Sequence, residues 1–295
     1  MILSYIVDDL LKYPIVRNVL KNRFNMSNRL ITKLKNNKLI FLNNKTTYLD
    51  AKLSMGDIIS CSLDICEESE NIIPIKMDLD INYEDDCLIV INKPPHIAVH
   101  PSISHYENSL SNGVKYYFNS IGLKKKIRPV NRLDRDTTGL VIFAKNEYIQ
   151  ESLIRQMMLN KFYKEYIAIL DGIVNPDKGI IDAPIGRKES SIIERCINEN
   201  GSPAITNYEI VSLFNNMSLV KFVLKTGRTH QIRVHSQFIG HSIIGDTLYG
   251  NSSSLINRQA LHCYRLIFNH PIKNKKIELV APIPDDFQNI LNKNV

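Results

Sequence analysis

The strongest constraint on this chain is a series of short apolar runs that each border a glycine or a proline. "LIVINK" is stopped by Pro94 and Pro95, "LVIFA" follows Gly139, and the runs in "KEYIAILDG" and "LVKFVLKTG" end at Gly172 and Gly227. Such runs between turn signals are typical of β-strands. In the last two runs, apolar residues stand at alternate positions, which predicts a strand with one buried face. Strands outnumber helices without alternating regularly with them. The sequence therefore predicts an α+β fold with a mixed, largely antiparallel sheet rather than a Rossmann fold.

Two segments of this strand-rich region have helical spacing instead. Ile149, Leu153 and Met157 recur every four residues, which predicts an amphipathic helix. "THQIRVHSQFIG" predicts a second helix, with Thr229 as its N-cap and Gly240 just beyond its end.

Composition places the chain among globular proteins that bury a core. Its 295 residues suit one large domain and a small one, and 44% are hydrophobic against 23% charged. We expect a cytoplasmic protein without membrane contact, because no apolar run is long enough to span a bilayer and the first residues lack the pattern of a signal peptide. The 5 cysteines are scattered, and no nearby Cys or His completes a zinc pattern around Cys61 and Cys66. We expect reduced cysteines and no metal.

Positive charge is concentrated at the start of the chain. Residues 1–60 hold 10 Lys and Arg against 4 Asp and Glu, whereas the rest of the chain is nearly balanced. This asymmetry favours a module that binds a polyanion over the alternative of an ordinary solvated face.

Residues 1–65 have the pattern of a small α/β RNA-binding domain. "SNRLITKLKNNK" predicts a helix with Ser27 as its N-cap and with Arg29 and Lys33 on one face. The strand-like pieces of "LIFLNNKTTYLD" and "LSMGDIISCSL" follow it. The whole is similar to the S4-type RNA-binding domain. Acidic "CEESENIIPIK" then predicts a linker over 66–76, which leaves 77–295 as the second domain.

Four stretches of that second domain hold polar residues that a core does not need. They are residues 132–139 around Asp134, the strand with Tyr166, "TGRTHQIRVH", and "GDTLYG". Asp134 has too few companions for a carboxylate-pair hydrolase, and no nucleotide-binding or serine-nucleophile motif occurs. His230 and His235 are spaced wrongly for zinc on one helical face, so we expect packing histidines. We also expect three residues to shape a loop rather than touch substrate: Gly245, Asp246 and Gly250.

Asn131–Leu140, "NRLDRDTTGL", resembles the "HRLDxxTSGL" signature of the RluA-type pseudouridine synthases. Further blocks match that family in order: "YEDDCLIVINKPPHIAVHP", "KEYIAILDG", "APIGR", "LKTGRTHQIRVH", "GHSIIGDTLYG", "RQALHCYRLIFNHP" and "APIPDDF". The resemblance covers about residues 80–287. Asn131 replaces the usual His, Thr138 the usual Ser, and Ser242 stands where Pro is common. None of the three is the nucleophile, so these departures bear on substrate choice rather than on activity.

The resemblance implies that uridine in RNA is isomerised to pseudouridine without a metal or organic cofactor. Asp134 is then the catalytic carboxylate, as a nucleophile or through assistance to glycosidic cleavage and proton removal, and Arg233 is its cationic partner. Tyr166 stacks on the extruded base or moves a proton. Arg132 fills the gap left by the flipped nucleotide or holds a phosphate.

The predicted partner is RNA, with large-subunit ribosomal RNA preferred and tRNA second. The N-terminal residues expected to contact phosphates are Arg17, Arg29, Lys33, Lys35 and Lys38. Nothing in the sequence demands more than a monomer. The alternative from another class is a non-catalytic RNA-binding or ribosome-assembly factor on the same fold, which has no need of an acid at position 134.

Overall fold

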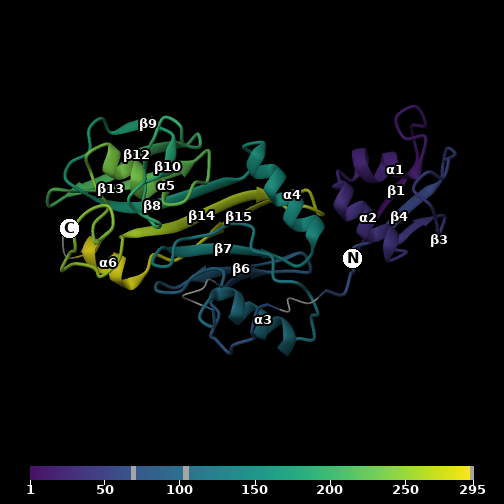
Figure 1. Cartoon of the computed structure of the whole chain (residues 1–295), viewed down its shortest axis with the longest axis horizontal. Helices are drawn as coiled ribbons and strands as arrows, with labels where there is room; N and C mark the ends of the chain where they lie inside the picture. The colour runs from purple at the N-terminus through teal and green to yellow at the C-terminus, as the bar shows by residue number, and fades with distance from the viewer. Residues whose placement is uncertain (68–70, 102–105, 293–295) are drawn as a thin grey trace.

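The computed structural model of this protein describes residues 1–67, 71–101 and 106–292. The chain forms two units, each built on its own β-sheet, with the smaller, N-terminal unit next to helix α4 (Glu147–Met158) of the larger one (Figure 1). Each unit has its own hydrophobic core. Within the described residues, no helix is both long and apolar enough to cross a membrane.

The N-terminal unit is a four-stranded antiparallel sheet in the order β1-β4-β2-β3, with its helices packed on it. Ser27 caps α2 by accepting a hydrogen bond from the backbone N–H of Leu30, as predicted. Asn43 and Asn44 both have left-handed backbones, which produces the tight turn between β2 and β3. Its elements are β1 (Ile2–Ile6), α1 (Val16–Asn18), the π-helical turn η1 (Val19–Arg23), α2 (Asn28–Asn36), β2 (Ile40–Leu42), β3 (Lys45–Thr46) and β4 (Ile58–Ser62).

The larger unit contains a nine-stranded sheet in the order β5-β6-β7-β14-β8-β13-β12-β9, with β15 paired to β14. Every strand pairing described in it is antiparallel except β7 with β14, which confirms the predicted fold class. Its strands are β5 (Ile81–Glu84), β6 (Leu88–Lys93), β7 (Thr138–Ala144), β8 (Tyr163–Asp171), β9 (Lys178–Asp182), β12 (Ile205–Phe214), β13 (Met217–Leu224), β14 (Leu261–Asn269) and β15 (Lys276–Val280). The remaining elements are α3 (Leu110–Ser120), α5 (Gln231–Phe238), α6 (Asp285–Asn292) and a separate two-stranded ribbon of β10 (Ile185–Arg187) and β11 (Arg195–Ile197).

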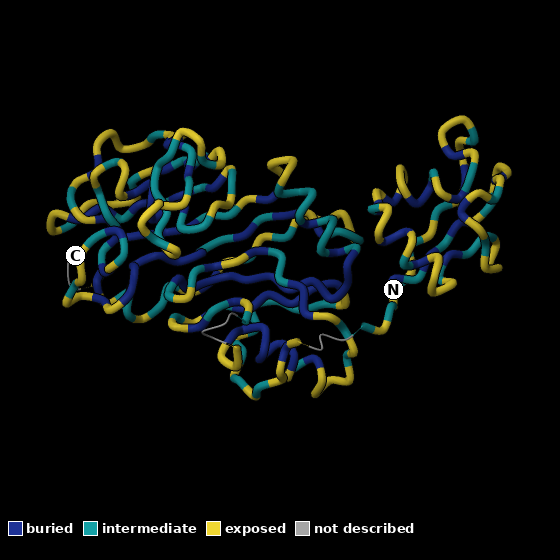
Figure 2. The backbone as a smooth tube through the Cα atoms, in the orientation of Figure 1, coloured by how far each residue is buried: buried dark blue, intermediate teal, exposed yellow. Residues whose placement is uncertain are grey.

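Burial along the central strands shows which sequence patterns were informative. All of β7 is buried, and dark blue runs through the middle of the sheet (Figure 2). In β13 buried and half-buried residues alternate from Leu219 onward, as predicted. The predicted alternation in β8 is wrong, because every residue from Tyr166 to Leu170 is buried. That strand is paired with β14 and β13 along its two edges, and the burial of successive residues shows that both of its faces are covered as well.

The N-cap predicted for α5 is also wrong. The cap residue is His230, one position after Thr229, and its backbone is left-handed at φ 58°. The side chain of Gln231 accepts hydrogen bonds from the Arg228 backbone N–H and from the Thr226 hydroxyl, which folds the preceding turn back before the helix begins. Gly240 follows the helix end with φ 86°, as predicted.

Candidate active site

The loop that carries Asp134 is anchored on both sides before it enters β7. The amide of Asn131 donates to the carbonyl of Leu140 and accepts from the N–H of Ile142, so this side chain pairs with β7 as a strand residue would. The buried ammonium of Lys93 donates to the carbonyl of Arg135 at 2.8 Å, and to two carbonyls of its own loop. These contacts hold the backbone around Asp134 without using its side chain.

Gly139 sets how closely this loop approaches β14. Its φ is 108°, and a Cβ at this position would lie 2.2 Å from the carbonyl oxygen of Cys263. Only glycine allows that contact, which occurs where β7 and β14 pair in parallel. The end of the Asp134 loop therefore lies in close backbone contact with β14.

Asp134 contacts Arg233, the partner predicted from the family resemblance. Its Oδ2 accepts a hydrogen bond from Arg233 NH1 at 3.1 Å, although the two residues lie 99 positions apart. The carboxylate is 26% exposed, whereas the guanidinium is 8% exposed. Oδ1 has no hydrogen-bond partner within the described part of the chain, which leaves one carboxylate oxygen available to a substrate.

Arg233 is itself held by Asp246, a side chain that is 1% exposed. Nε and NH2 of the guanidinium donate to the two carboxylate oxygens at 2.7 and 2.8 Å. Burial disfavours the charge on Arg233, but its bonds to Asp246 and Asp134 outweigh burial and raise its pKa. Arg233 therefore stays cationic and fixed in direction. Asp246 is not among the described lining residues of the pockets at Asp134, and its contact with Arg233 means that it does more than shape a loop.

His230 lies on the same side of Asp134 as Arg233. Its Nε2 is 3.8 Å from Asp134 Oδ2, and its Nδ1 is 2.8 Å from the Tyr249 hydroxyl. The Tyr249 oxygen already accepts a hydrogen bond from the backbone N–H of Arg195. Its own proton is thus available to Nδ1, which favours the tautomer with an N–H facing Asp134. Burial lowers the pKa of His230, so the ring is neutral near pH 7.

Tyr166 lies on β8 and lines the same pocket as Asp134. Burial raises its pKa well above the ordinary value, and Cys263 and the Asp134 carboxylate raise it further. The phenol therefore remains protonated through the physiological range. It offers a ring face and a hydroxyl proton, and it cannot act as a phenolate base there.

A cavity of about 1000 Å³ opens at these residues. Asp134 is the only acid among its described lining residues, which include the cations Arg132, Lys164, Lys225 and Arg228. Its volume suits a nucleotide with part of its backbone. A single carboxylate among cations is an arrangement that attracts an anionic polymer and presents one acid to it.

The N-terminal residues predicted to bind phosphate do not line this cavity. Arg29 and Lys33 of α2 lie 3.4 and 3.2 Å from the carboxylate of Glu147 on α4, and Lys33 also pairs with Glu67. Arg17 pairs with Asp50 at 3.2 Å. Lys35 and Lys38 are exposed. The basic face of α2 is thus partly neutralised by ion pairs with acidic residues of this same chain.

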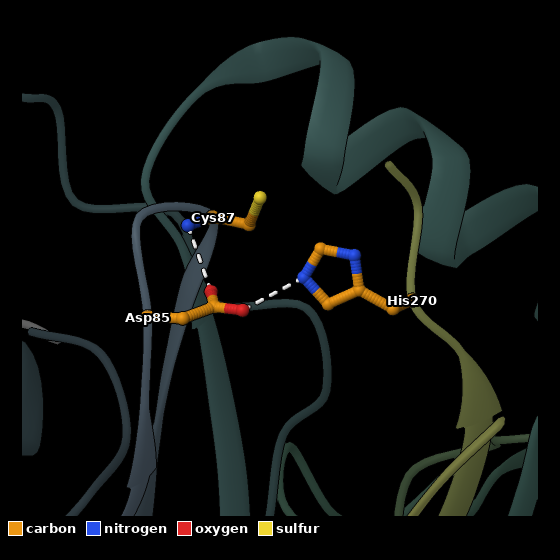
Figure 3. A group of neighbouring side chains, drawn as sticks. All are labelled: Asp85, Cys87 and His270. Atoms are coloured by element: carbon orange, nitrogen blue, oxygen red, sulfur yellow. Dashed lines mark hydrogen bonds and ion pairs between the residues drawn. The ribbon is translucent and has the colours of Figure 1, made fainter. Parts of the chain in front are cut away.

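One group of potential metal ligands lies elsewhere, between the β5–β6 turn and the end of β14: Asp85, Cys87 and His270 (Figure 3). His270 Nδ1 accepts from two backbone N–H groups, so Nε2 carries the proton that it donates to Asp85 at 2.8 Å. Asp85 also accepts from the Cys87 N–H at 2.8 Å, and burial raises the pKa of the Cys87 thiol to about 12. Through these hydrogen bonds the group joins the β5–β6 turn to the turn that follows β14.

The sequence patterns did not predict that Asp246 and His230 contribute to the site. Both lie in stretches already marked by their unexplained polar residues. His230 is three positions before Arg233, and this spacing on one turn was the available signal. No local signal connects Asp246 to Arg233, because the contact depends on the loop folding back onto α5.

Comparison with known proteins identifies one family. Residues 87–238 match the family model described as RNA pseudouridylate synthase. The chain is 35% identical over 267 residues to the uncharacterized RNA pseudouridine synthase YjbO of Bacillus subtilis, covering 90% of this chain and 94% of that protein. It is 36% identical over 277 residues to the ribosomal large subunit pseudouridine synthase D of Blochmanniella floridana, covering 86% of each. The solved structure of human RNA Pseudouridylate Synthase Domain Containing 1 is 27% identical, with a TM-score of 0.58 over 70% of this chain and 83% of that one.

The fold and the site thus define an RNA-modifying isomerase. The chain belongs to the RNA pseudouridylate synthase family, which confirms the family resemblance of its motifs.

Proposed function

We propose that this chain converts uridines of large-subunit ribosomal RNA to pseudouridine, with Asp134 as the catalytic carboxylate. The observation that carries the proposal is the lone acid of a basic, nucleotide-sized cavity, held through one oxygen by Arg233. The relative from Blochmanniella floridana is named for the large ribosomal subunit, which favours ribosomal RNA over tRNA.

In this reaction the bond between C1′ of the ribose and N1 of uracil breaks, the base turns over, and a bond forms between C1′ and C5. The C5 proton leaves and N1 gains a proton, so the isomerisation is balanced without a cofactor. The free Oδ1 of Asp134 is the atom placed to attack or to take a proton, while Arg233 fixes the direction of the carboxylate through Oδ2.

The target base must leave its stack to reach Asp134, at a cost of a few kcal/mol. Stacking on Tyr166 recovers roughly 1–3 kcal/mol. Arg132 lines the cavity beside Asp134, where it can hold a phosphate or occupy the gap left by the base. Residues 1–65 act as an S4-like RNA-binding module, and the protein works as a cytoplasmic monomer.

The decisive experiment compares Asp134→Asn with Asp136→Asn on RNA labelled with tritium at C5 of uridine. Asp136 is a matched control, because it is an acid of the same loop that pairs with Arg135 and His96 outside the cavity. We expect Asp134→Asn to bind RNA normally and release no tritium, while Asp136→Asn retains turnover. Tritium release by Asp134→Asn at the wild-type rate refutes the catalytic role of Asp134, whereas absence of release by the wild-type protein favours the non-catalytic RNA-binding alternative.

The substrate is tested separately by mapping pseudouridines in cells that lack this protein. Loss of sites from large-subunit ribosomal RNA supports the proposal. Loss confined to tRNA would move the substrate to that class while leaving the chemistry at Asp134 intact.

A further inference from the structure

The arginines of residues 77–292 fall into two groups according to their counterions. Those that form an ion pair with a carboxylate are Arg128, Arg135, Arg233, Arg258 and Arg265. Among the described residues, those without one are Arg132, Arg155, Arg187, Arg195 and Arg228. Arg155 donates to a backbone carbonyl of the N-terminal unit. The other four all line the active-site cavity or a hollow that adjoins it.

This adjoining hollow has a volume of about 350 Å³ and lies against the β10–β11 ribbon. Arg187 of β10, Arg195 of β11 and Arg228 line it, and no acid is among its described lining residues. Arg228 and Thr229 line both the hollow and the active-site cavity, so the two spaces adjoin at the turn before α5. A polymer that enters one of them can extend into the other.

The walls of the hollow are fixed by the backbone. Arg195 donates its N–H to the Tyr249 hydroxyl at 2.7 Å, and a Cβ on Gly201 would lie 2.5 Å from the backbone of Ile185. Arg228 Nε donates to the Pro203 carbonyl at 2.9 Å, and Arg195 NH1 to two carbonyls of its own turn. Carbonyl acceptors orient a guanidinium without neutralising it, so the charges remain available to an anion.

We propose that this hollow binds phosphodiester groups of the RNA strand next to the target uridine, with Arg187 and Arg195 as its phosphate contacts. A planar guanidinium fork suits a phosphate, and three of them without counterions favour a ligand that brings its own negative charge. Because the hollow adjoins the active-site cavity, the strand that carries the target base is favoured over a free small anion. This inference rests on the proposed function, and it adds where the RNA strand next to the target uridine lies on the protein.

The test uses the full chain with Arg187→Gln and Arg195→Gln combined, and Lys188→Gln as the control. Lys188 is a cation of the same ribbon that pairs with Glu194 and does not line the hollow. With a stem-loop ribosomal RNA fragment, we expect the double variant to raise KM roughly tenfold while kcat changes less than about threefold. In the Asp134→Asn background, the slope of log K against log salt concentration should fall by about 1.4, or 0.7 per lost phosphate contact. Lys188→Gln should leave both quantities near wild type.

An unchanged KM and salt slope in the double variant would overturn the inference. An equal rise in KM and an equal fall in salt slope for Lys188→Gln would also overturn it, because the effect would then depend on net positive charge and not on the hollow. Matching melting curves exclude a folding defect. If the wild-type protein formed no pseudouridine, the proposed function would fail, but the salt slopes would still decide whether the hollow binds RNA.

Discussion

Asp246 binds two nitrogens of Arg233, and this contact directs the third nitrogen toward Asp134. The two carboxylates therefore share one guanidinium, with the deeper one 1% exposed and the shallower one 26% exposed. The buried acid holds the arginine, while the arginine holds one oxygen of an acid that lines the cavity.

Asp246→Asn should reduce catalysis although Asp246 is not among the described lining residues of the cavity. Without the second carboxylate Arg233 is no longer held through Nε and NH2, and its NH1 loses its fixed direction toward Asp134. Removal of one partner from a buried pair typically costs ~3–5 kcal/mol of folding free energy. We expect lower stability in urea and a loss that falls on kcat more than on KM in tritium-release assays. A wild-type kcat in a folded Asp246→Asn protein would contradict this role.

Substitutions of Tyr166 should separate its ring from its hydroxyl. If the ring stacks on the extruded base, Tyr166→Phe should bind RNA as tightly as wild type in the Asp134→Asn background. Tyr166→Ala should lose roughly 1–3 kcal/mol of binding free energy. Fluorescence of a 2-aminopurine placed beside the target uridine reports whether the base is still extruded. Equal binding by the Phe and Ala variants would show that the ring does not stack.

The contact between Asp85 and His270 should make folding stability sensitive to acid. Burial disfavours the Asp85 charge, but the hydrogen bonds that it accepts outweigh burial and lower its pKa to about 2, against ~3.9 in an unfolded chain. The unfolded chain therefore binds the proton more readily, and the stabilisation is complete above about pH 5 and disappears as the pH falls toward 2.

We expect Asp85→Asn to unfold at lower urea, with a deficit of roughly 1–3 kcal/mol at pH 7. The curves of variant and wild type should approach each other below pH 4. Asp86→Asn, at the exposed neighbouring position, is the control and should follow wild type throughout. A deficit independent of pH would mean that the Asp85 charge is not what stabilises this turn.

Glu147→Gln should strengthen RNA binding if the basic face of α2 contacts phosphates. Glu147 lies against both Arg29 and Lys33, so RNA has to compete with this carboxylate for them. Glu151→Gln is the matched control, because Glu151 accepts a hydrogen bond from Ser27 and pairs with no cation in the described residues. Fluorescence anisotropy at several salt concentrations should show tighter binding and a steeper salt dependence for Glu147→Gln alone. Deletion of residues 1–65 should have the opposite effect, weakening binding and flattening its salt dependence.

Local patterns in the sequence determined much of this protein. The positions of the central strands, the Ser27 cap and the α4 helix follow from hydrophobic period and turn chemistry, which act over a few residues. The ordered motifs also identified the family and marked Asp134, Tyr166 and Arg233, which the structure brings together around one cavity. These features are readable because each is contained in a short stretch of chain.

Only the tertiary structure decided how those stretches meet. The Asp246 contact to Arg233, the Arg233 contact to Asp134 and the pairing of Lys33 with Glu147 across 114 residues depend on how separate segments pack together. The hollow of unpaired arginines likewise arises where β10, β11 and the turn before α5 converge. The sequence shows which residues are charged, but the topology of the sheet determines which of them form ion pairs. Long-range strand pairing brings acids and bases together that no local sequence pattern connects.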